Sequence, residues 1–173
     1  MNVLFFIAGA VALLAAGMAV FQRSAIHALL YLVVSFIGLG VDFFLLGAPF
    51  AAVLEVIIYA GAIMVLFVFV IMMLNIKGSW SEEKGLFRAR SWAAPGFLAS
   101  VLAAELIYVF WSTSHGAYPI GMVEPKAVSV SLFGPYVLAV ELASIVLLAG
   151  LVGAYHLAHR IGSATRNEES RHE

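Results

Sequence analysis

Apolar residues fill five long stretches of this 173-residue chain, and short polar segments separate them. The stretches lie at about residues 2–21, 26–46, 50–74, 92–111 and 135–158. A helix needs about 20 consecutive apolar residues to cross the hydrocarbon of a bilayer, so each stretch predicts a membrane-spanning helix. The pattern therefore predicts an all-α fold, namely a polytopic integral membrane protein with five transmembrane helices.

The distribution of polar residues predicts one membrane domain with a short tail. We expect the five helices to form a domain over residues 1–161. Residues 162–173 contain no apolar residue beyond Ala164, so they predict a solvated or disordered polar tail. The first stretch has no Lys or Arg before it, and we therefore expect a retained helix there instead of a signal peptide.

Two connections on the same side of the membrane differ in length. Residues 112–134 are rich in Ser, Gly and Pro and predict an exposed loop, after which Gly134-Pro135 begins the last helix. The connection around Gly47-Ala48-Pro49 is so short that the second and third spans must be antiparallel neighbours.

Basic residues indicate how the helices are oriented. Eight of the nine share one side of the membrane: Arg23, Lys77, Lys84, Arg88, Arg90, Arg160, Arg166 and Arg171. Lys126 alone lies on the other side. Because cytoplasmic loops carry an excess of Lys and Arg, the pattern predicts an outer N-terminus and a cytoplasmic C-terminus.

Composition excludes several classes of function. Hydrophobic residues make up 64% of the chain and charged residues 11%, and the basic residues form no single face that would bind nucleic acid. The chain has no cysteine, so it can form no disulfide and no thiolate-ligated iron–sulfur cluster. Any redox cofactor is therefore expected in another polypeptide.

Four carboxylates fall within the predicted spans, where no Lys or Arg is available to neutralise them. They are Asp42, Glu55, Glu105 and Glu141. Counted along the helices, all four lie in the outer half of the membrane. Asp42 is explained equally well as an interfacial side chain that reaches water and as a functional group. For Glu105 the interfacial explanation is slightly favoured. Glu141 lies in a dense apolar stretch with Ser144 one turn away, and this pattern fits either a functional or a helix-packing role.

Glu55 is the strongest functional candidate, because an ionisable group inside a membrane must be protonated, paired or in contact with a polar path. Tyr59, four residues further on, lies on the same face of a helix and offers a phenol that could donate to the carboxylate or relay a proton. The alternative is a local hydrogen bond that only satisfies a buried Glu.

The third span is also the longest. As a straight α-helix, residues 50–74 would extend about 37 Å, against about 30 Å of hydrocarbon, so the helix must tilt, bend or bulge. Gly61 lowers helix stability by about 1 kcal/mol relative to alanine and is one place where the helix could rearrange. Close packing through Ala60, Gly61 and Ala62 is the equally good alternative.

Three segments carry a resemblance to a known family. HALLYL (27–32), LEVIIYAGAIMVLFVFVIMMLN (54–75) and LFGPYVLAVELAS (132–144) closely resemble subunit J of the bacterial proton-pumping NADH:quinone oxidoreductase, respiratory complex I. The match covers all five spans in order, and the third-span segment is its most specific part.

The resemblance implies a membrane-arm subunit in the bacterial inner membrane, packed against other subunits of complex I. NADH, FMN, iron–sulfur clusters and quinone would be bound by those other subunits, and this chain would bind none of them and not be catalytic alone. In this family the third helix holds a π-bulge, which maps here onto Tyr59, Ala60 and Gly61. Its conversion to α-helix would open or close a water path, and the carboxylate that the resemblance carries over is Glu55. The residues themselves make Tyr59, Glu141 and Asp42 further candidates for the proton path.

Two other functions remain open at this stage. The chain could be a purely structural subunit whose carboxylates hold helices together and whose loss prevents assembly. It could also be the equivalent subunit of a related hydrogenase-type or antiporter-type complex.

Overall fold

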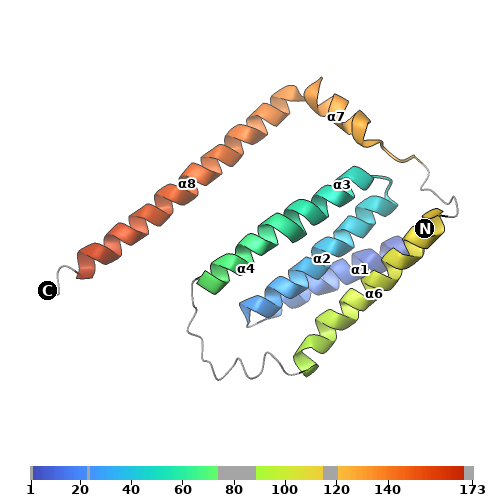
Figure 1. Cartoon of the computed structure of the whole chain (residues 1–173), viewed down its shortest axis with the longest axis horizontal. Helices are drawn as coiled ribbons and strands as arrows, with labels where there is room; N and C mark the ends of the chain where they lie inside the picture. The colour runs from blue at the N-terminus through green and yellow to red at the C-terminus, as the bar shows by residue number, and fades with distance from the viewer. Residues whose placement is uncertain (1, 23, 74–88, 115–120, 170–173) are drawn as a thin grey trace. The chain divides into compact units, whose positions relative to one another are not determined.

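The computed structural model describes residues 2–22, 24–73, 89–114 and 121–169, and these residues form helices joined by short turns, with no strand among them. The elements are α1 (Asn2–Phe21), α2 (Ala25–Leu45), α3 (Pro49–Leu54), the π-helix η1 (Glu55–Ile63), α4 (Met64–Met73), α6 (Ala89–Ser114), α7 (Pro125–Phe133) and α8 (Val137–Glu169). They are drawn in Figure 1. The predicted all-α class is therefore confirmed.

Five helical stretches of the described chain are long and apolar enough to cross a membrane. They are Val3–Phe21, Ala25–Leu45, Pro49–Met73, Ala93–Ser112 and Val137–Ala158. Each lies within two residues of a predicted span at both ends, because long apolar runs are the least ambiguous pattern in a membrane sequence. The contacts divide the chain into two units, Met1–Glu124 and Pro125–Glu173.

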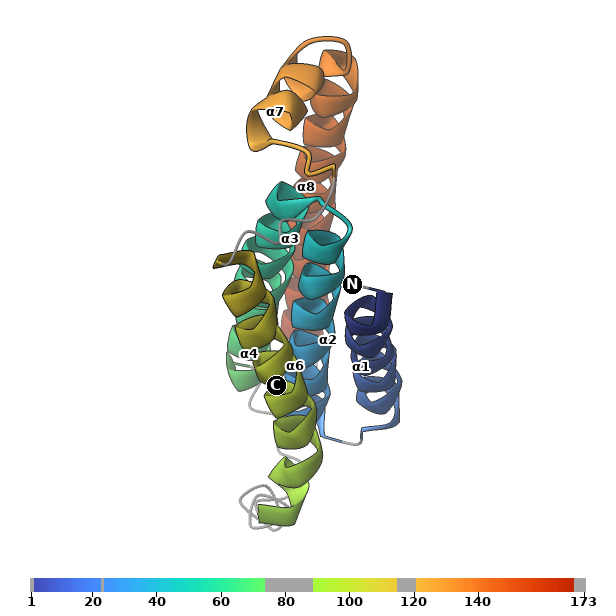
Figure 2. The ribbon, with the colours of Figure 1, turned by 90° about the vertical axis from the view of Figure 1, so that its right-hand side faces the viewer.

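Helix α2 is the centre of the first unit. It contacts α1, α6 and all three parts of the third span, and Figure 2 shows α1 and α4 on opposite sides of it. The expected antiparallel packing of the second and third spans is present.

Small residues bring α1 and α2 together. The buried face of α1 carries an alanine at nearly every turn: Ala8, Ala12, Ala15 and Ala19. Opposite this face lies Gly38 of α2, where an added Cβ would lie 3.1 Å from the Ala12 Cβ and 3.3 Å from the Ala8 carbonyl oxygen. At this close approach the Ser35 hydroxyl donates a 2.9 Å hydrogen bond to the Ala12 carbonyl oxygen. Small residues and hydroxyls are what hold helices together where lipid removes the hydrophobic driving force.

The turn between α2 and α3 is closed by hydrogen bonds. The Gly47 N–H donates to the Phe44 carbonyl (3.0 Å), and the Ala48 N–H donates to the Phe43 carbonyl (2.9 Å). With Gly47 at a φ of +82°, this is a Schellman C-cap, which favours glycine at the left-handed position. The Gly47 carbonyl also accepts a 2.9 Å hydrogen bond from the Val123 N–H, and this bond fixes the turn to the segment that follows α6.

The second unit differs from the sequence prediction in three ways. Residues 125–133, expected in a loop, form α7, because Pro125 is suited to the first position of a helix. The last helix begins at Val137 instead of at Gly134-Pro135, since residues 134–136 form a turn in which the Tyr136 N–H donates to the Ser131 carbonyl (3.1 Å). The backbone of α8 stays helical to Glu169, eight residues into the predicted tail, where Ala and Glu have good helix propensity.

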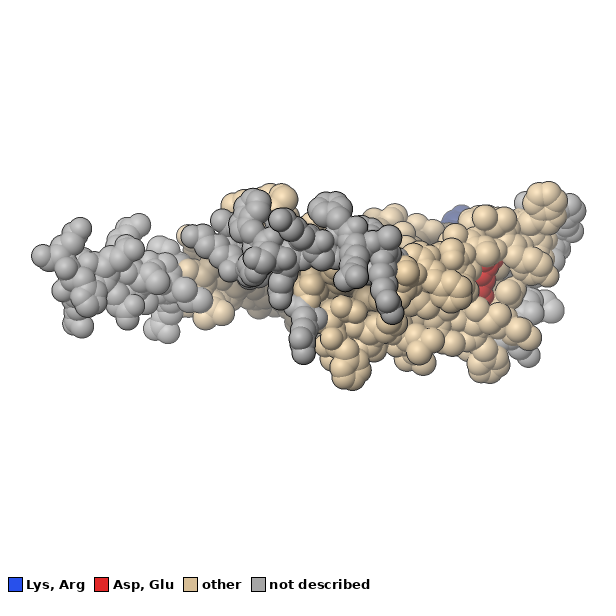
Figure 3. Space-filling view, turned by 90° about the horizontal axis from the view of Figure 1, so that it is seen from below, with Lys and Arg blue, Asp and Glu red and all other residues tan. Residues whose placement is uncertain are grey.

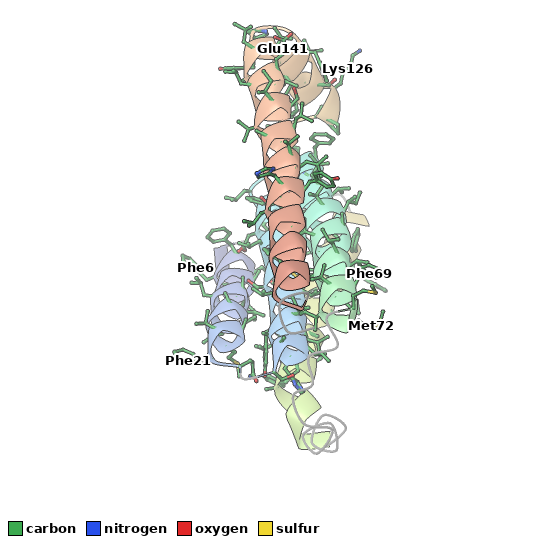
Figure 4. The ribbon with its side chains drawn as sticks, turned by 90° about the vertical axis from the view of Figure 1, so that its left-hand side faces the viewer. Phe6, Phe21, Phe69, Met72, Lys126 and Glu141 are labelled. Carbon is green, nitrogen blue, oxygen red and sulfur yellow. The ribbon has the colours of Figure 1, made fainter. Side chains whose placement is uncertain are left out.

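Large apolar side chains point outward from both units. Figure 4 shows Phe6 and Phe21 on α1, and Phe69 and Met72 on α4, projecting away from the helices. On the face in Figure 3 the described surface is almost entirely uncharged. Apolar surface on this scale requires lipid or other apolar protein surfaces around it.

Gly38→Val should separate α1 from α2. The Gly38 site has no room for a side chain, so the bulk should cost about 1–3 kcal/mol of unfolding free energy. Thermal unfolding of the detergent-solubilised protein measures this cost. The matched control is Gly17→Val, since an added Cβ at Gly17 of α1 meets nothing within 4 Å; equal losses in the two variants would contradict the packing account.

Candidate functional site

The third span contains a change of helix type. It begins as α-helix in α3, continues as the nine-residue π-helix η1 from Glu55 to Ile63, and returns to α-helix in α4. A π-helix bonds each N–H to the carbonyl five residues earlier, is rare, and often marks a functional site. Tyr59, Ala60 and Gly61 all lie inside η1, at the positions where the resemblance implies a bulge.

Backbone geometry around Gly61 reflects the five-residue hydrogen-bond spacing of η1. An added Cβ at Gly61 would lie 3.3 Å from the carbonyl oxygen of Val56, five residues earlier. At the end of η1 the Met64 N–H donates to the carbonyls of both Tyr59 and Gly61. The shared donor marks the point at which the five-residue hydrogen-bond spacing ends.

One face of η1 packs against α2. An added Cβ at Gly40 would lie 3.3 Å from Val56 Cγ2, and the rings of Phe36 and Tyr59 lie 5.3 Å apart between centroids. The remaining η1 side chains are half-buried or exposed. The π-helix therefore packs against α2 on one face and leaves its other faces largely uncovered.

Glu55 is the first residue of η1 and is half-buried. Tyr59, which remains 46% exposed, packs its ring against α2, and in the part of the chain that the structure describes no hydrogen bond joins it to Glu55. The Glu55–Tyr59 relay therefore stays a prediction. Glu55 is therefore a partly exposed acid at the start of the π-helix, and its carboxyl group is accessible from outside this chain.

Asp42 and Glu105 are the buried carboxylates of the described chain. Asp42 on α2 is 7% exposed and Glu105 on α6 is 5% exposed. One oxygen of Asp42 and both oxygens of Glu105 are buried without a hydrogen-bond partner. They lie on the neighbouring helices α2 and α6, on which the rings of Phe44 and Phe110 lie 6.5 Å apart between centroids. The expectation that these two residues reach water at the interface does not fit this burial within the chain.

The spacing of residues along the helices could have identified this burial. Asp42 follows Ser35 and Gly38 at intervals of seven and four residues, so the three share the face of α2 that meets α1. On α6 the buried side chains recur with helical period: Pro95, Leu98, Leu102, Glu105 and Val109. Glu105 therefore occupies a core position of its helix.

Glu141 lies on α8, near the start of the helix (Figure 4), and is exposed within the second unit. The Ser144 hydroxyl donates its 2.7 Å hydrogen bond to the backbone carbonyl of Glu141 and not to the carboxylate. The acid group is therefore left available to a neighbouring molecule.

The chemistry that these groups offer is proton binding. The described residues contain no cluster of three or more His, Asp or Glu side chains that could hold a metal ion. What the described spans present is a set of carboxyl groups and a phenol, which take up and release protons.

Comparison with known proteins identifies the family. Residues 15–157 match the family described as NADH-ubiquinone/plastoquinone oxidoreductase chain 6. NADH-quinone oxidoreductase subunit J of Pseudomonas aeruginosa is 50% identical over 163 residues, which cover 92% of this chain and 98% of that protein.

Two further relatives bear the same name. Subunit J of Escherichia coli strain K12 is 44% identical over 172 residues, covering 98% of this chain and 94% of the relative. Subunit J of Buchnera aphidicola from Schizaphis graminum is 39% identical over 158 residues, covering 91% and 97%. With the five apolar helices of the fold, these matches show that the chain belongs to the subunit J family of NADH-quinone oxidoreductase, complex I.

Proposed function

We propose that this chain helps to couple quinone reduction to proton translocation, and that the π-helix η1 is the gate of a polar, water-containing path. The observation that carries the proposal is the stretch of π-helix that begins at Glu55 in the middle of a membrane span. Quinone reduction in neighbouring subunits would drive an electrostatic and conformational change to which η1 responds.

A change between π- and α-helix would move side chains without unfolding the span. A π-turn holds one residue more than an α-turn, so its conversion rotates the following residues by about 100° around the axis. Such a rotation exchanges the residues that face α2 with those that face neighbouring chains. The side chains that line the path at this depth of the membrane would then change between apolar and polar ones.

Several groups are proposed to bind protons along this path. Glu55 stands at the start of η1, and Tyr59, Ala60 and Gly61 form the part of η1 that changes conformation. Glu141 and Asp42 are further candidate positions. Glu55 is best placed among them, because its carboxylate is partly open and on the element that would rearrange.

The remaining parts of the proposal concern the complex as a whole. NADH, FMN, iron–sulfur clusters and quinone are bound by other subunits, so this chain is a non-redox part of a translocase. Its spans form one membrane domain in the bacterial inner membrane, with the N-terminus outside, the C-terminus in the cytoplasm and residues 162–173 as a cytoplasmic tail. The distribution of basic residues supports this orientation.

A purely structural role in assembly is the second candidate. The observation that favours it is the exposure, within the second unit, of nearly every described side chain of α8, since apolar helix surface that its own unit leaves uncovered is available for packing against helices of other subunits. Variants that separate subunit content from activity distinguish the two functions.

Gly61→Val should impair coupled turnover more than assembly. The new side chain would crowd the Val56 carbonyl and change the free-energy difference between the π-helical and α-helical forms of η1 by about 1–3 kcal/mol. This change should lower coupled quinone reduction several-fold. Quinone reductase activity and proton pumping of the purified complex, normalised to subunit content, measure the effect. Gly96→Val is the control, because an added Cβ at Gly96 meets nothing within 4 Å; normal rates in an assembled Gly61→Val enzyme would count against the gate.

Glu55→Gln should slow proton transfer and leave the complex assembled. The amide keeps the size of the side chain but cannot take up a proton at neutral pH. Proton pumping in reconstituted vesicles, compared with subunit content, tests this expectation. Wild-type pumping would remove Glu55 from the path, and a loss of subunit content instead of pumping would favour the structural role.

A further inference from the structure

A second proton site is built into the first unit, away from the π-helix. We propose that Asp42 of α2 and Glu105 of α6 together bind one proton, so that only one of the two carboxyl groups is ionised. The site takes a proton from water and involves no redox step. It would hold α6 against α2 as long as the proton stays in place.

The burial of both carboxyl groups and their missing hydrogen bonds favour a bound proton. Both side chains are more than nine-tenths buried, and three of their four oxygens are buried without a hydrogen bond. An unpaired buried carboxylate costs several kcal/mol, so two of them in one apolar interior need compensation. A single proton supplies it, because protonation of either carboxyl group removes one of the two buried charges.

The surroundings of the pair are apolar. Gly9 of α1 faces Asp42, whose Oδ2 would lie 3.4 Å from an added Cβ. Val41 and Leu102 belong to the buried cluster of this unit. Toward the ends of α2 and α6, the rings of Phe44 and Phe110 lie 6.5 Å apart between centroids. These contacts keep water from solvating the two charges.

No cation on the packed helices can replace the proton. Helix α1 contains no titratable side chain. On α2 the other titratable groups are His27 and Tyr31, about 22 and 16 Å from Asp42 along the axis. On α6 Arg90 lies about 22 Å from Glu105 along the axis, and Tyr108 is exposed.

A bound metal cation is a poorer occupant than a proton. Hard cations take six or more oxygen ligands, whereas this site offers two carboxylates and apolar neighbours. The nearest hydroxyl on the same face of α2, that of Ser35, already donates to the Ala12 carbonyl.

A shared proton makes the packing of α6 on α2 depend on pH. The packed pair holds one proton more than two separated carboxylates hold in neutral water. Raising the pH therefore destabilises the packed state, because loss of the proton leaves two like charges facing each other. Packing should be retained at acid and neutral pH and lost at alkaline pH.

The test uses the intact complex and measures how much of this subunit it retains after incubation at increasing pH. Glu105→Gln and Asp42→Asn imitate the neutral acid, so each variant should keep the wild-type subunit content at neutral pH. Each should also raise the pH of half-loss by about one unit or more. Glu124→Gln, a change at an exposed acid outside the spans, should leave the pH of half-loss where it is in the wild type.

Three results would overturn the proposal. Loss of the subunit at neutral pH in both amide variants would mean that the charges are needed, as in an ion pair with a neighbouring chain. An unchanged pH of half-loss in both variants would mean that the pair binds no proton linked to packing. A shift of the wild-type value between sodium-free and sodium-rich buffers would identify a cation site.

Discussion

The close approach of α1 and α2 is the contact on which the rest of the first unit depends. Two helices in lipid gain little from burying apolar surface, so their association needs short distances and local polar bonds. The alanine face of α1, the absent side chain at Gly38 and the Ser35 hydrogen bond to Ala12 provide both. Because α2 is held in this way, its other faces can position α6 and the third span.

Helix α2 thereby separates two kinds of polar site. On one face Gly40 and Phe36 meet the π-helix, and Glu55 there is partly open to its surroundings. On another face Asp42 is buried, and Glu105 is buried on the neighbouring helix α6, each with almost no exposure. The partly exposed Glu55 is suited to exchange protons with a water path. The enclosed pair of Asp42 and Glu105 is suited to hold a proton in place.

Periodicity and length alone predict most of this fold. The five spans follow from apolar runs long enough for hydrocarbon, and the short turn at Gly47 follows from its residues. The helix α7 escapes prediction, since Ser- and Pro-containing segments are typical of loops and only local capping makes residues 125–133 helical. The helical continuation of α8 to Glu169 is also not predicted from the sequence, because polar composition does not by itself end a helix.

The environments of the four acids could not be predicted from the sequence. Depth along a single helix cannot reveal which face meets a neighbour, and for this reason Asp42 and Glu105 look interfacial until α2 and α6 are placed together. Glu55 and Tyr59 illustrate the opposite case. Their four-residue spacing brings side chains together on an α-helix, but η1 is wound differently and the Tyr59 ring packs on Phe36.

The capped turn at Gly47 also has a mechanical consequence for the third span. Hydrogen bonds within the turn and from Val123 anchor the end at which α3 begins, while α4 leads away from η1 at the other end. A change in the winding of η1 would therefore meet a fixed helix on the α3 side. With α3 held in place, α4 would take up the resulting rotation.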